Sequence, residues 1–244
     1  MKKKILLFAM LFLASVHLVW SQNNTFNWIP LIGEDAPAFT AQTTNGILHF
    51  PADLGLKWKI LLSHPADFTP VCTSEIMKLA IMQQEFKALN VELAVISTDE
   101  LSLHQSWVKS MDGMIYNESA PVKIDFPLID DSKLEISKKY GMISPSADAG
   151  RTVRAVFIID PQNKVAAIFY YPHNVGRNLE EIKRTVVALQ TAQKHPVLLP
   201  VDWKPGDDVL LPYPYPYTCY DSIQRADAGF HNISWYMMYK KPDK

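Results

Sequence analysis

The chain of 244 residues is 48% hydrophobic and 20% charged, and its formal net charge is −1 at pH 7. These proportions are ordinary for a globular protein, and no run of lysine and arginine indicates nucleic-acid binding. The two cysteines, Cys72 and Cys219, lie outside any C-x-x-C pair, and no Cys/His group has the spacing of zinc ligands. The sequence therefore predicts a globular protein without a metal site.

Residues 1–21 are predicted to be a secretory signal peptide. A positive start at Lys2–Lys4 precedes the apolar run Ile5–Leu13, and Val19–Ser21 is a suitable cleavage site. The apolar run is short for a membrane span, although a retained N-terminal anchor is the alternative interpretation. No cysteine follows the run, which argues against a lipoprotein signal. We therefore expect a secreted or periplasmic protein that has no stable membrane association after signal cleavage.

The segment around Cys72 predicts a strand, a loop and a helix in succession. The apolar run Ile60–His64 is typical of a buried strand, which we expect over Lys57–Ser63, and Pro65 and Pro70 then force a loop. Apolar residues at helical spacing follow, so Cys72 is placed at the start of a helix. Unpaired N–H groups and the positive end of the helix dipole favour a thiolate there. Because the hydroxyl of Thr69 can approach the same sulfur, this loop is predicted to be a site of sulfur chemistry.

The remainder of the chain alternates predicted strands with predicted helices. β-Branched runs indicate the strands, and residues 98–100 offer hydroxyl and carboxylate groups that can cap the following helix. The alternation ends in an antiparallel pair and a helix, and it predicts a mixed α/β sheet. A hairpin turn is expected at residues 43–46, strands at 91–97, 126–130, 153–160 and 165–171, and helices at 101–111, 132–140 and 178–194.

The loop before Cys72 resembles the active-site loop of the peroxiredoxins. Its pattern P-x-x-x-T-x-x-C is carried by Pro65, Thr69 and Cys72. The lead-in residue His64 and the run Phe68–Thr73 are most similar to the subgroup that contains one-cysteine and archaeal enzymes. Because many positions match at once, the resemblance is far more specific than a bare T-x-x-C.

The resemblance covers most of the chain, from about Gly33 to Pro212. It implies an α/β thioredoxin-like fold, a central mixed sheet flanked by helices, in a domain spanning residues 22–195. Residues 196–244 resemble the C-terminal extension of the same subgroup. Within the extension, Pro212–Tyr217 alternates proline with tyrosine and cannot form a core alone. We expect this stretch to lie at a dimer interface, and a solvated tail is the alternative.

The resemblance assigns the chemistry to four residues. Cys72 would be the peroxidatic nucleophile, and its first product would be a sulfenic acid. Thr69 would donate a hydrogen bond to the peroxide or accept one from it, and Pro65 would shield the sulfur from water. Arg154 matches the family's active-site arginine within R-x-V-F-I-x-D, and its guanidinium would stabilise the thiolate and bind the peroxide. Without the resemblance, an arginine that opens an apolar strand is usually an exposed edge charge.

Further residues are expected to support the site. The resemblance places His64 at the border of the peroxide pocket and Arg177 beside the first arginine, while Glu75 would orient the arginines. Each also has a plain structural interpretation, as a core histidine, a helix-end cation and a helix-start carboxylate. His104 and Trp107 share one face of a predicted helix, and we expect them to pack beneath the site rather than act in catalysis.

The resemblance leaves open how the sulfenic acid is reduced. Archaeal relatives carry a resolving cysteine near the chain end, and the matching stretch 233–239 has the aromatic residues but no cysteine. Either Cys219 resolves Cys72 across a dimer, or an external thiol does so with one cysteine; we expect Cys219 to take part. Without the sequence around Cys72, a structural disulfide between the two cysteines would be the plainest interpretation for an exported protein; with that sequence it is the less favoured alternative.

We therefore expect a thiol peroxidase that reduces hydrogen peroxide and organic hydroperoxides in antioxidant defence. It would use a thioredoxin-like or other thiol reductant and no cofactor, and it would form a homodimer or a ring of dimers.

Two other functions are considered. A thioredoxin-like disulfide oxidoreductase needs a second thiol two residues from the first, which Val71–Glu75 lacks. A holdase-like oligomer would use the cysteines only as a bridge. The phospholipase activity of part of the subgroup is not expected, because Lys57 and Pro51 stand where the lipase serine and histidine would be and no G-x-S-x-G occurs.

Overall fold

The structure is a computed structural model, and it describes residues 29–143, 150–212, 229–234 and 236–242. The predicted signal peptide, residues 213–217 of the Pro-Tyr stretch and Cys219 lie outside these residues. In the part of the chain that is described, no helix has the length and apolar character needed to cross a membrane.

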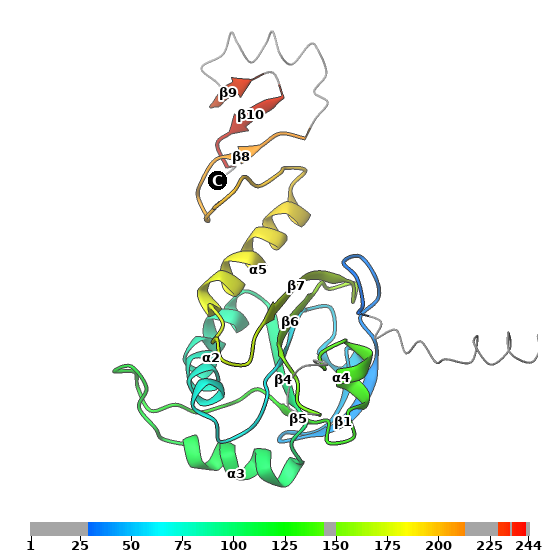
Figure 1. Cartoon of the computed structure of the whole chain (residues 1–244). Helices are drawn as coiled ribbons and strands as arrows, with labels where there is room; N and C mark the ends of the chain where they lie inside the picture. Colours follow the sequence, from blue (N-terminus) through cyan, green and yellow to red (C-terminus); the bar gives the residue numbers. More distant parts are fainter. Residues whose placement is uncertain (1–28, 144–149, 213–228, 235, 243–244) are drawn as a thin grey trace, which may run out of the picture.

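A seven-stranded sheet lies at the centre of the molecule, in the order β2-β1-β5-β4-β3-β6-β7 (Figure 1). The pairs β3–β4 and β4–β5 are parallel, and the other neighbours are antiparallel. This mixed sheet confirms the predicted α/β class. The strands are β1 (Phe39–Thr43), β2 (Gly46–Phe50), β3 (Trp58–Ser63), β4 (Val91–Ser97), β5 (Leu128–Asp130), β6 (Arg154–Ile159) and β7 (Val165–Tyr171).

Side chains of the central strands alternate between two cores, one on each face of the sheet. In β3, Ile60 and Leu62 pack with residues of α2, α3 and α5, whereas Leu61 packs on the opposite face with residues of α4, β1 and β2. Figure 1 shows α2 and α5 on one side of the sheet and α4 on the other. The helices are α2 (Pro70–Ala88), α3 (Leu101–Met111), α4 (Glu135–Lys139) and α5 (Leu179–Lys194), with a short 3₁₀ helix η1 (Ala52–Leu54).

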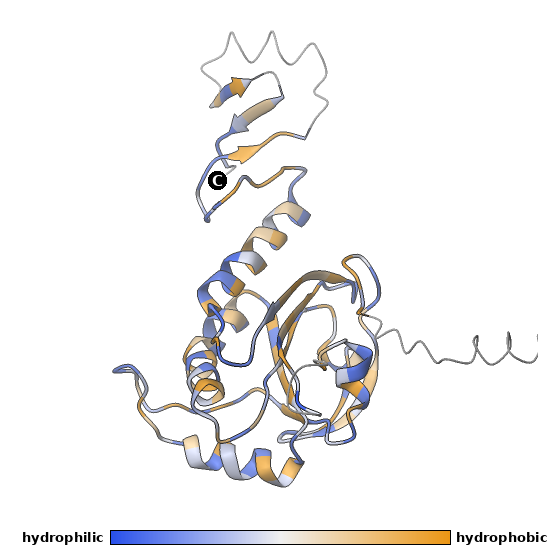
Figure 2. Cartoon of the chain, in the orientation of Figure 1, coloured by the Kyte–Doolittle hydropathy of each residue, from blue (hydrophilic) through white to orange (hydrophobic). Residues whose placement is uncertain are grey.

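The residues after α5 form a second sheet that the sequence did not lead us to expect. Its order is β8-β10-β9, with β8 (Val209–Leu210), β9 (Phe230–Ser234) and β10 (Met237–Lys240). Figure 1 shows this sheet beyond the end of α5, away from the seven-stranded sheet. Figure 2 shows that α5 carries hydrophilic and hydrophobic residues along its length, which suits a helix with one buried face.

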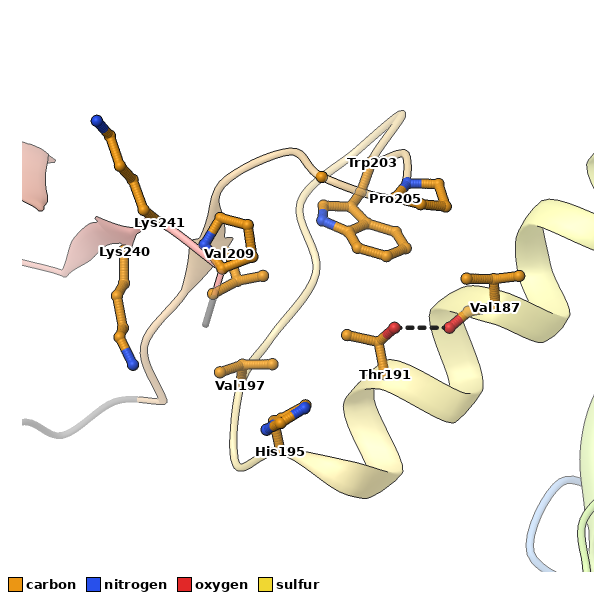
Figure 3. A pocket seen from close by; sticks show the side chains of 11 residues that line it. Val187, Thr191, His195, Val197, Trp203, Pro205, Val209, Lys240 and Lys241 are labelled. Atoms are coloured by element: carbon orange, nitrogen blue, oxygen red, sulfur yellow. Dashed lines mark hydrogen bonds between the residues drawn. The ribbon is translucent and has the colours of Figure 1, made fainter. Parts of the chain in front are cut away.

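A pocket of about 210 Å³ lies where the extension packs against α5 (Figure 3). Val187 of α5 and the indole of Trp203 line it, and the guanidinium of Arg184 donates to the Trp203 carbonyl oxygen at 3.0 Å. Trp203 is only 3% exposed, so it joins the extension to the main domain. No residue of the Cys72 loop lines this pocket.

Most predicted elements agree with the structure to within a residue at each end, and two differ more. Strand β5 begins at Leu128 rather than at residue 126, and α4 is shorter than the predicted helix 132–140. The cap of α3 also differs, because the Leu101 N–H donates to the carboxylate of Asp130 at 3.0 Å and not to residues 98–100. The carboxylate of Asp99 instead accepts the backbone N–H of Asp67 at 2.7 Å. Asp99 therefore fixes the Cys72 loop rather than the helix.

Replacing Phe86 with alanine should lower the free energy of unfolding by about 3–5 kcal/mol. The Phe86 side chain is fully buried in the core that also contains Cys72, so its loss leaves a cavity. Denaturant unfolding checks this value, with Leu56→Ala as the control because Leu56 is 81% exposed. A change below about 1 kcal/mol for Phe86→Ala would contradict the described core.

Candidate active site

Cys72 lies in the first turn of α2, as the sequence predicted, and its side chain is fully buried. Pro70 occupies the first helical position, where its fixed φ suits a helix start and its missing N–H has no intrahelical partner to lose. Thr69 precedes it with extended backbone angles. The sulfur is thus held at the positive end of a helix of 19 residues, inside the protein.

The loop before the helix is fixed by its own hydrogen bonds. The Thr69 hydroxyl donates to the carbonyl oxygen of Ala66 at 2.8 Å. Since a hydroxyl has one hydrogen and two lone pairs, Thr69 retains the capacity to accept a hydrogen bond. Phe68 has a φ of 53°, in the left-handed region that non-glycine residues seldom adopt, so the backbone at the mouth of the loop is strained. Pro65 is half-buried in this loop.

Arg154 opens β6 and points its guanidinium at the sulfur. Its Nη1 donates to Cys72 Sγ at 3.3 Å and to Glu75 Oε2 at 2.7 Å. Its Nε and Nη2 both donate to the carbonyl oxygen of His173, at 2.9 and 2.6 Å. The side chain is only 3% exposed, so it is not the exposed edge charge that an isolated interpretation of the sequence would suggest.

Arg177 and Glu75 complete a buried network behind Arg154. The Arg177 Nε and Nη2 donate to the two carboxylate oxygens of Glu75 at 2.9 and 2.7 Å, and its backbone N–H adds a third bond at 2.7 Å. Its Nη1 donates to the carbonyl oxygens of Ser63 and Ala155, at 2.9 and 3.0 Å. The Glu75 carboxylate therefore orients both arginines, as the sequence led us to expect.

The charges of this network do not cancel. Two buried guanidinium groups face one buried carboxylate, which leaves an excess of one positive charge beside the sulfur. A buried charge is stabilised when it is paired and hydrogen-bonded. The Arg154 guanidinium therefore lies where it can stabilise negative charge on the Cys72 sulfur.

His64 directly follows β3. Its neighbours are the two arginines and the side chains of Asp67 and His104. Its backbone is fixed at both ends, because its N–H donates to the Ile96 carbonyl oxygen at 3.0 Å and its carbonyl oxygen accepts the Thr152 hydroxyl at 2.6 Å. Burial, together with the charges of His104, Arg177 and Arg154, holds the pKa of His64 well below its usual value. The imidazole is therefore neutral at pH 7.

His104 and Trp107 lie beneath the loop, where the sequence placed them. The Trp107 ring packs on His64 with their centroids 5.1 Å apart. His104, however, is more than packing, because its Nδ1 lies 2.7 Å from Oδ2 of Asp67. Sequence reasoning missed Asp67, and its place within the Pro65–Cys72 loop was the one signal that could have pointed to it.

His64, Asp67 and His104 also form a group whose metal-ligating atoms lie within 4.8 Å of one another in the described part of the chain. The carboxylate of Asp67 is already hydrogen-bonded to His104, and positively charged arginines lie nearby. The residues therefore fit a hydrogen-bonded cluster better than a cation site. The prediction that the protein holds no metal stays a prediction.

A buried thiol, at a helix start and bonded to a guanidinium on a thioredoxin-like sheet, defines a thiol-dependent oxidoreductase. Residues 32–168 match the model of the AhpC/TSA family, and residues 188–218 match the C-terminal domain of 1-Cys peroxiredoxin. The chain belongs to the peroxiredoxin family, whose members are thiol peroxidases. The fold and family expected from the sequence are therefore confirmed.

Individual relatives agree with this assignment. A peroxiredoxin of Methanosarcina mazei is 47% identical over 215 residues, with 87% of this chain and 98% of the relative covered. The structure of a yeast mitochondrial 1-Cys peroxiredoxin is 35% identical with a TM-score of 0.76, covering 88% of this chain and 100% of the other. Peroxiredoxin 6 of Arenicola marina gives 30% identity and a TM-score of 0.77, with 88% and 99% covered. The two alternative functions are not favoured by these matches.

Glu75→Gln should lower both stability and peroxidase rate. Removing the carboxylate charge leaves two buried guanidinium groups without their shared partner, which should cost about 3 kcal/mol in the free energy of unfolding. The peroxidase rate should fall because Arg154 is no longer held against the sulfur. Denaturant unfolding and steady-state peroxide consumption measure the two effects. Glu180→Gln, which removes a surface carboxylate paired with lysines, is the matched control and should change neither.

Proposed function

We propose that this peroxiredoxin reduces hydrogen peroxide and small organic hydroperoxides with Cys72 as the peroxidatic nucleophile, in antioxidant defence. The observation that carries the proposal is the 3.3 Å contact between Arg154 Nη1 and the sulfur of Cys72. This contact places a permanent positive charge and a donor at the atom that must attack the peroxide. Reaction within an enclosed site also keeps bulk water away from the sulfur.

The chemistry follows from that arrangement. The Cys72 thiolate attacks the hydroxyl oxygen of the peroxide ROOH, so that an S–O bond forms and the O–O bond breaks. The sulfur is oxidised to a sulfenic acid, and the leaving RO⁻ takes up a proton from solvent to give ROH. Negative charge thus moves from sulfur to the leaving oxygen. Arg154 stabilises both ends of this transfer, and the Thr69 oxygen accepts a hydrogen bond from the bound peroxide.

The reductant is proposed to be an external thiol, of the thioredoxin-like or another kind, with no cofactor. The yeast mitochondrial relative is resolved through glutathione/thioredoxin systems, which supports a thiol of this class. We further propose that Cys219 takes part in resolving Cys72 across a dimer. The alternative mechanism uses Cys72 alone.

A homodimer is proposed, and strand β7 supports it. At its first residue, Val165, strand β7 exchanges hydrogen bonds with Gly33 and Glu34. Beyond that residue it pairs, in the described sheet, only with β6, so the rest of its outer edge offers backbone N–H and C=O groups to a second chain. The exposed Tyr170 on this strand adds apolar surface. The protein is also proposed to be secreted or periplasmic, on the pattern of residues 1–21.

Cys72→Ser should abolish peroxide consumption, because a serine hydroxyl is not ionised at neutral pH and cannot be oxidised in the same way. The rate of peroxide loss with an excess of small-molecule thiol measures this. Cys219→Ser is the matched control and should keep the peroxide-reducing step. Full activity in Cys72→Ser would contradict the proposed mechanism.

Mass analysis without reductant, after one equivalent of peroxide, should identify the partner of Cys72. A new link between Cys72 and Cys219 is expected within seconds, in a species of twice the chain mass. A stable sulfenic acid at Cys72 with Cys219 still reduced would contradict the proposed role of Cys219 and leave the one-cysteine mechanism.

The mass of the exported protein also tests the predicted signal peptide. Cleavage after Ser21 should give a mature chain that begins at Gln22.

A further inference from the structure

Three titratable side chains lie fully buried beneath the Cys72 loop, and part of their hydrogen-bonding capacity is unused. His64, Asp67 and His104 each have side chains with no exposed surface. Within the described part of the chain, both ring nitrogens of His64 and the Oδ1 atom of Asp67 have no hydrogen-bond partner. Burying such atoms without partners is costly, so unpaired buried atoms at a reactive site call for an explanation.

His104 is the charged member of this group. Its Nε2 faces the Ile129 carbonyl oxygen at 3.1 Å, and because a carbonyl only accepts, Nε2 carries a hydrogen. Its Nδ1 faces the Asp67 carboxylate at 2.7 Å and is a donor too. Burial opposes the charged form, but the hydrogen bond and charge of Asp67 outweigh it and raise the pKa of His104. Burial raises the pKa of Asp67 as well, and the hydrogen bond and charge of His104 oppose that rise. The two donor nitrogens of His104 and the 2.7 Å contact therefore assign a buried ion pair to His104 and Asp67.

His64 is the neutral member, so one of its nitrogens donates and the other accepts. Its Nε2 lies 3.5 Å from the unpaired Oδ1 of Asp67, and the two atoms are complementary as donor and acceptor. A shift of a few tenths of an ångström joins them in a hydrogen bond. The other ring nitrogen then has a lone pair and no hydrogen-bond partner among the described residues.

We propose that Asp67 and His104 are positioning residues, whose ion pair holds His64 in one orientation and tautomer so that its free nitrogen accepts a hydrogen bond from the hydroxyl of bound peroxide. This inference rests on the proposed function. It adds a second acceptor to that of Thr69. The contacts join His104 of α3 to Asp67 in the loop, and Asp67 to His64 after the end of β3.

The group responds to pH through His104. As the pH rises through its raised pKa, His104 loses its proton, the ion pair disappears, and Asp67 loses the charged partner that fixes its orientation toward His64. The rate at which peroxide oxidises Cys72 should then fall, because the acceptor at His64 is lost and not because the thiol itself changes. The charged groups that face the cluster are Asp99 and Asp130 beside His104, and Arg154 and Arg177, with Glu75 between them, beside His64.

The test compares two reactions of Cys72 in the full-length mature protein. Oxidation by hydrogen peroxide depends on a group that accepts a hydrogen bond from the peroxide hydroxyl, whereas alkylation by iodoacetamide needs only the thiolate. Asp67→Asn and His104→Gln should each slow oxidation by about tenfold, the effect of one hydrogen bond, and leave alkylation within twofold. The wild-type ratio of oxidation to alkylation should fall as His104 deprotonates, and it should be flat with pH in His104→Gln.

The His64→Gln background separates positioning from general damage. If Asp67 acts through His64, adding Asp67→Asn to His64→Gln should cause no further loss of oxidation rate. An equal tenfold loss in that background would overturn the proposal, as would single variants that oxidise at the wild-type rate. A wild-type Cys72 that does not react with peroxide at all would instead overturn the proposed function.

Two controls and one competing outcome complete the design. Asp131→Asn removes another buried carboxylate, which accepts the N–H groups of Ile136 and Ser137, and it should leave the oxidation rate within twofold. His49→Gln breaks an exposed His–Asp pair and should do the same. Stoichiometric binding of Zn²⁺ that Asp67→Asn abolishes would overturn the proposal in favour of a metal site.

Discussion

One carboxylate shared by two arginines is the interaction on which this site depends. Glu75 fixes Arg154 and Arg177 by three side-chain bonds of 2.7–2.9 Å, and all three groups are buried. Because two guanidinium groups share one carboxylate, one positive charge is left over, and Arg154 directs it at the neighbouring sulfur at 3.3 Å. The pairing of the buried charges and the environment of Cys72 are therefore linked through Arg154.

The sheet brings these distant residues together. Strand β3 ends at Ser63 beside the start of β6, where the Ser63 hydroxyl donates to the Val153 carbonyl oxygen at 2.6 Å and accepts the Ala155 N–H at 3.0 Å. The loop that carries Cys72 leaves β3 at this point, while Arg154 enters on β6. Since β3 and β6 are antiparallel central strands, the end of one and the start of the other share one edge. The nucleophile and its arginine meet there although 82 positions separate them.

The sequence was most informative where one short motif carries the chemistry. Cys72 and Thr69 could be identified from their spacing, and apolar runs predicted most strands and helices, because burial imposes a regular pattern. Arg154 needed the family resemblance, since nothing local distinguishes it from a surface charge. The partnership of Asp67 with His104 could not be predicted, because it depends on how α3 packs beneath the loop. The sheet of β8, β9 and β10 was missed because its strands are short and because β8 lies far from its partner β10 in sequence.

The most direct test of the account is the rate at which peroxide oxidises Cys72 in Arg154→Lys. Lysine keeps the positive charge but has a single ammonium group, so it cannot bond the sulfur, Glu75 and His173 at once. The account predicts a loss of about 100-fold or more, measured by stopped flow against Arg184→Lys as the control. An Arg154→Lys protein that reacts as fast as the wild type would show that charge alone is sufficient, and it would contradict the central role of this geometry.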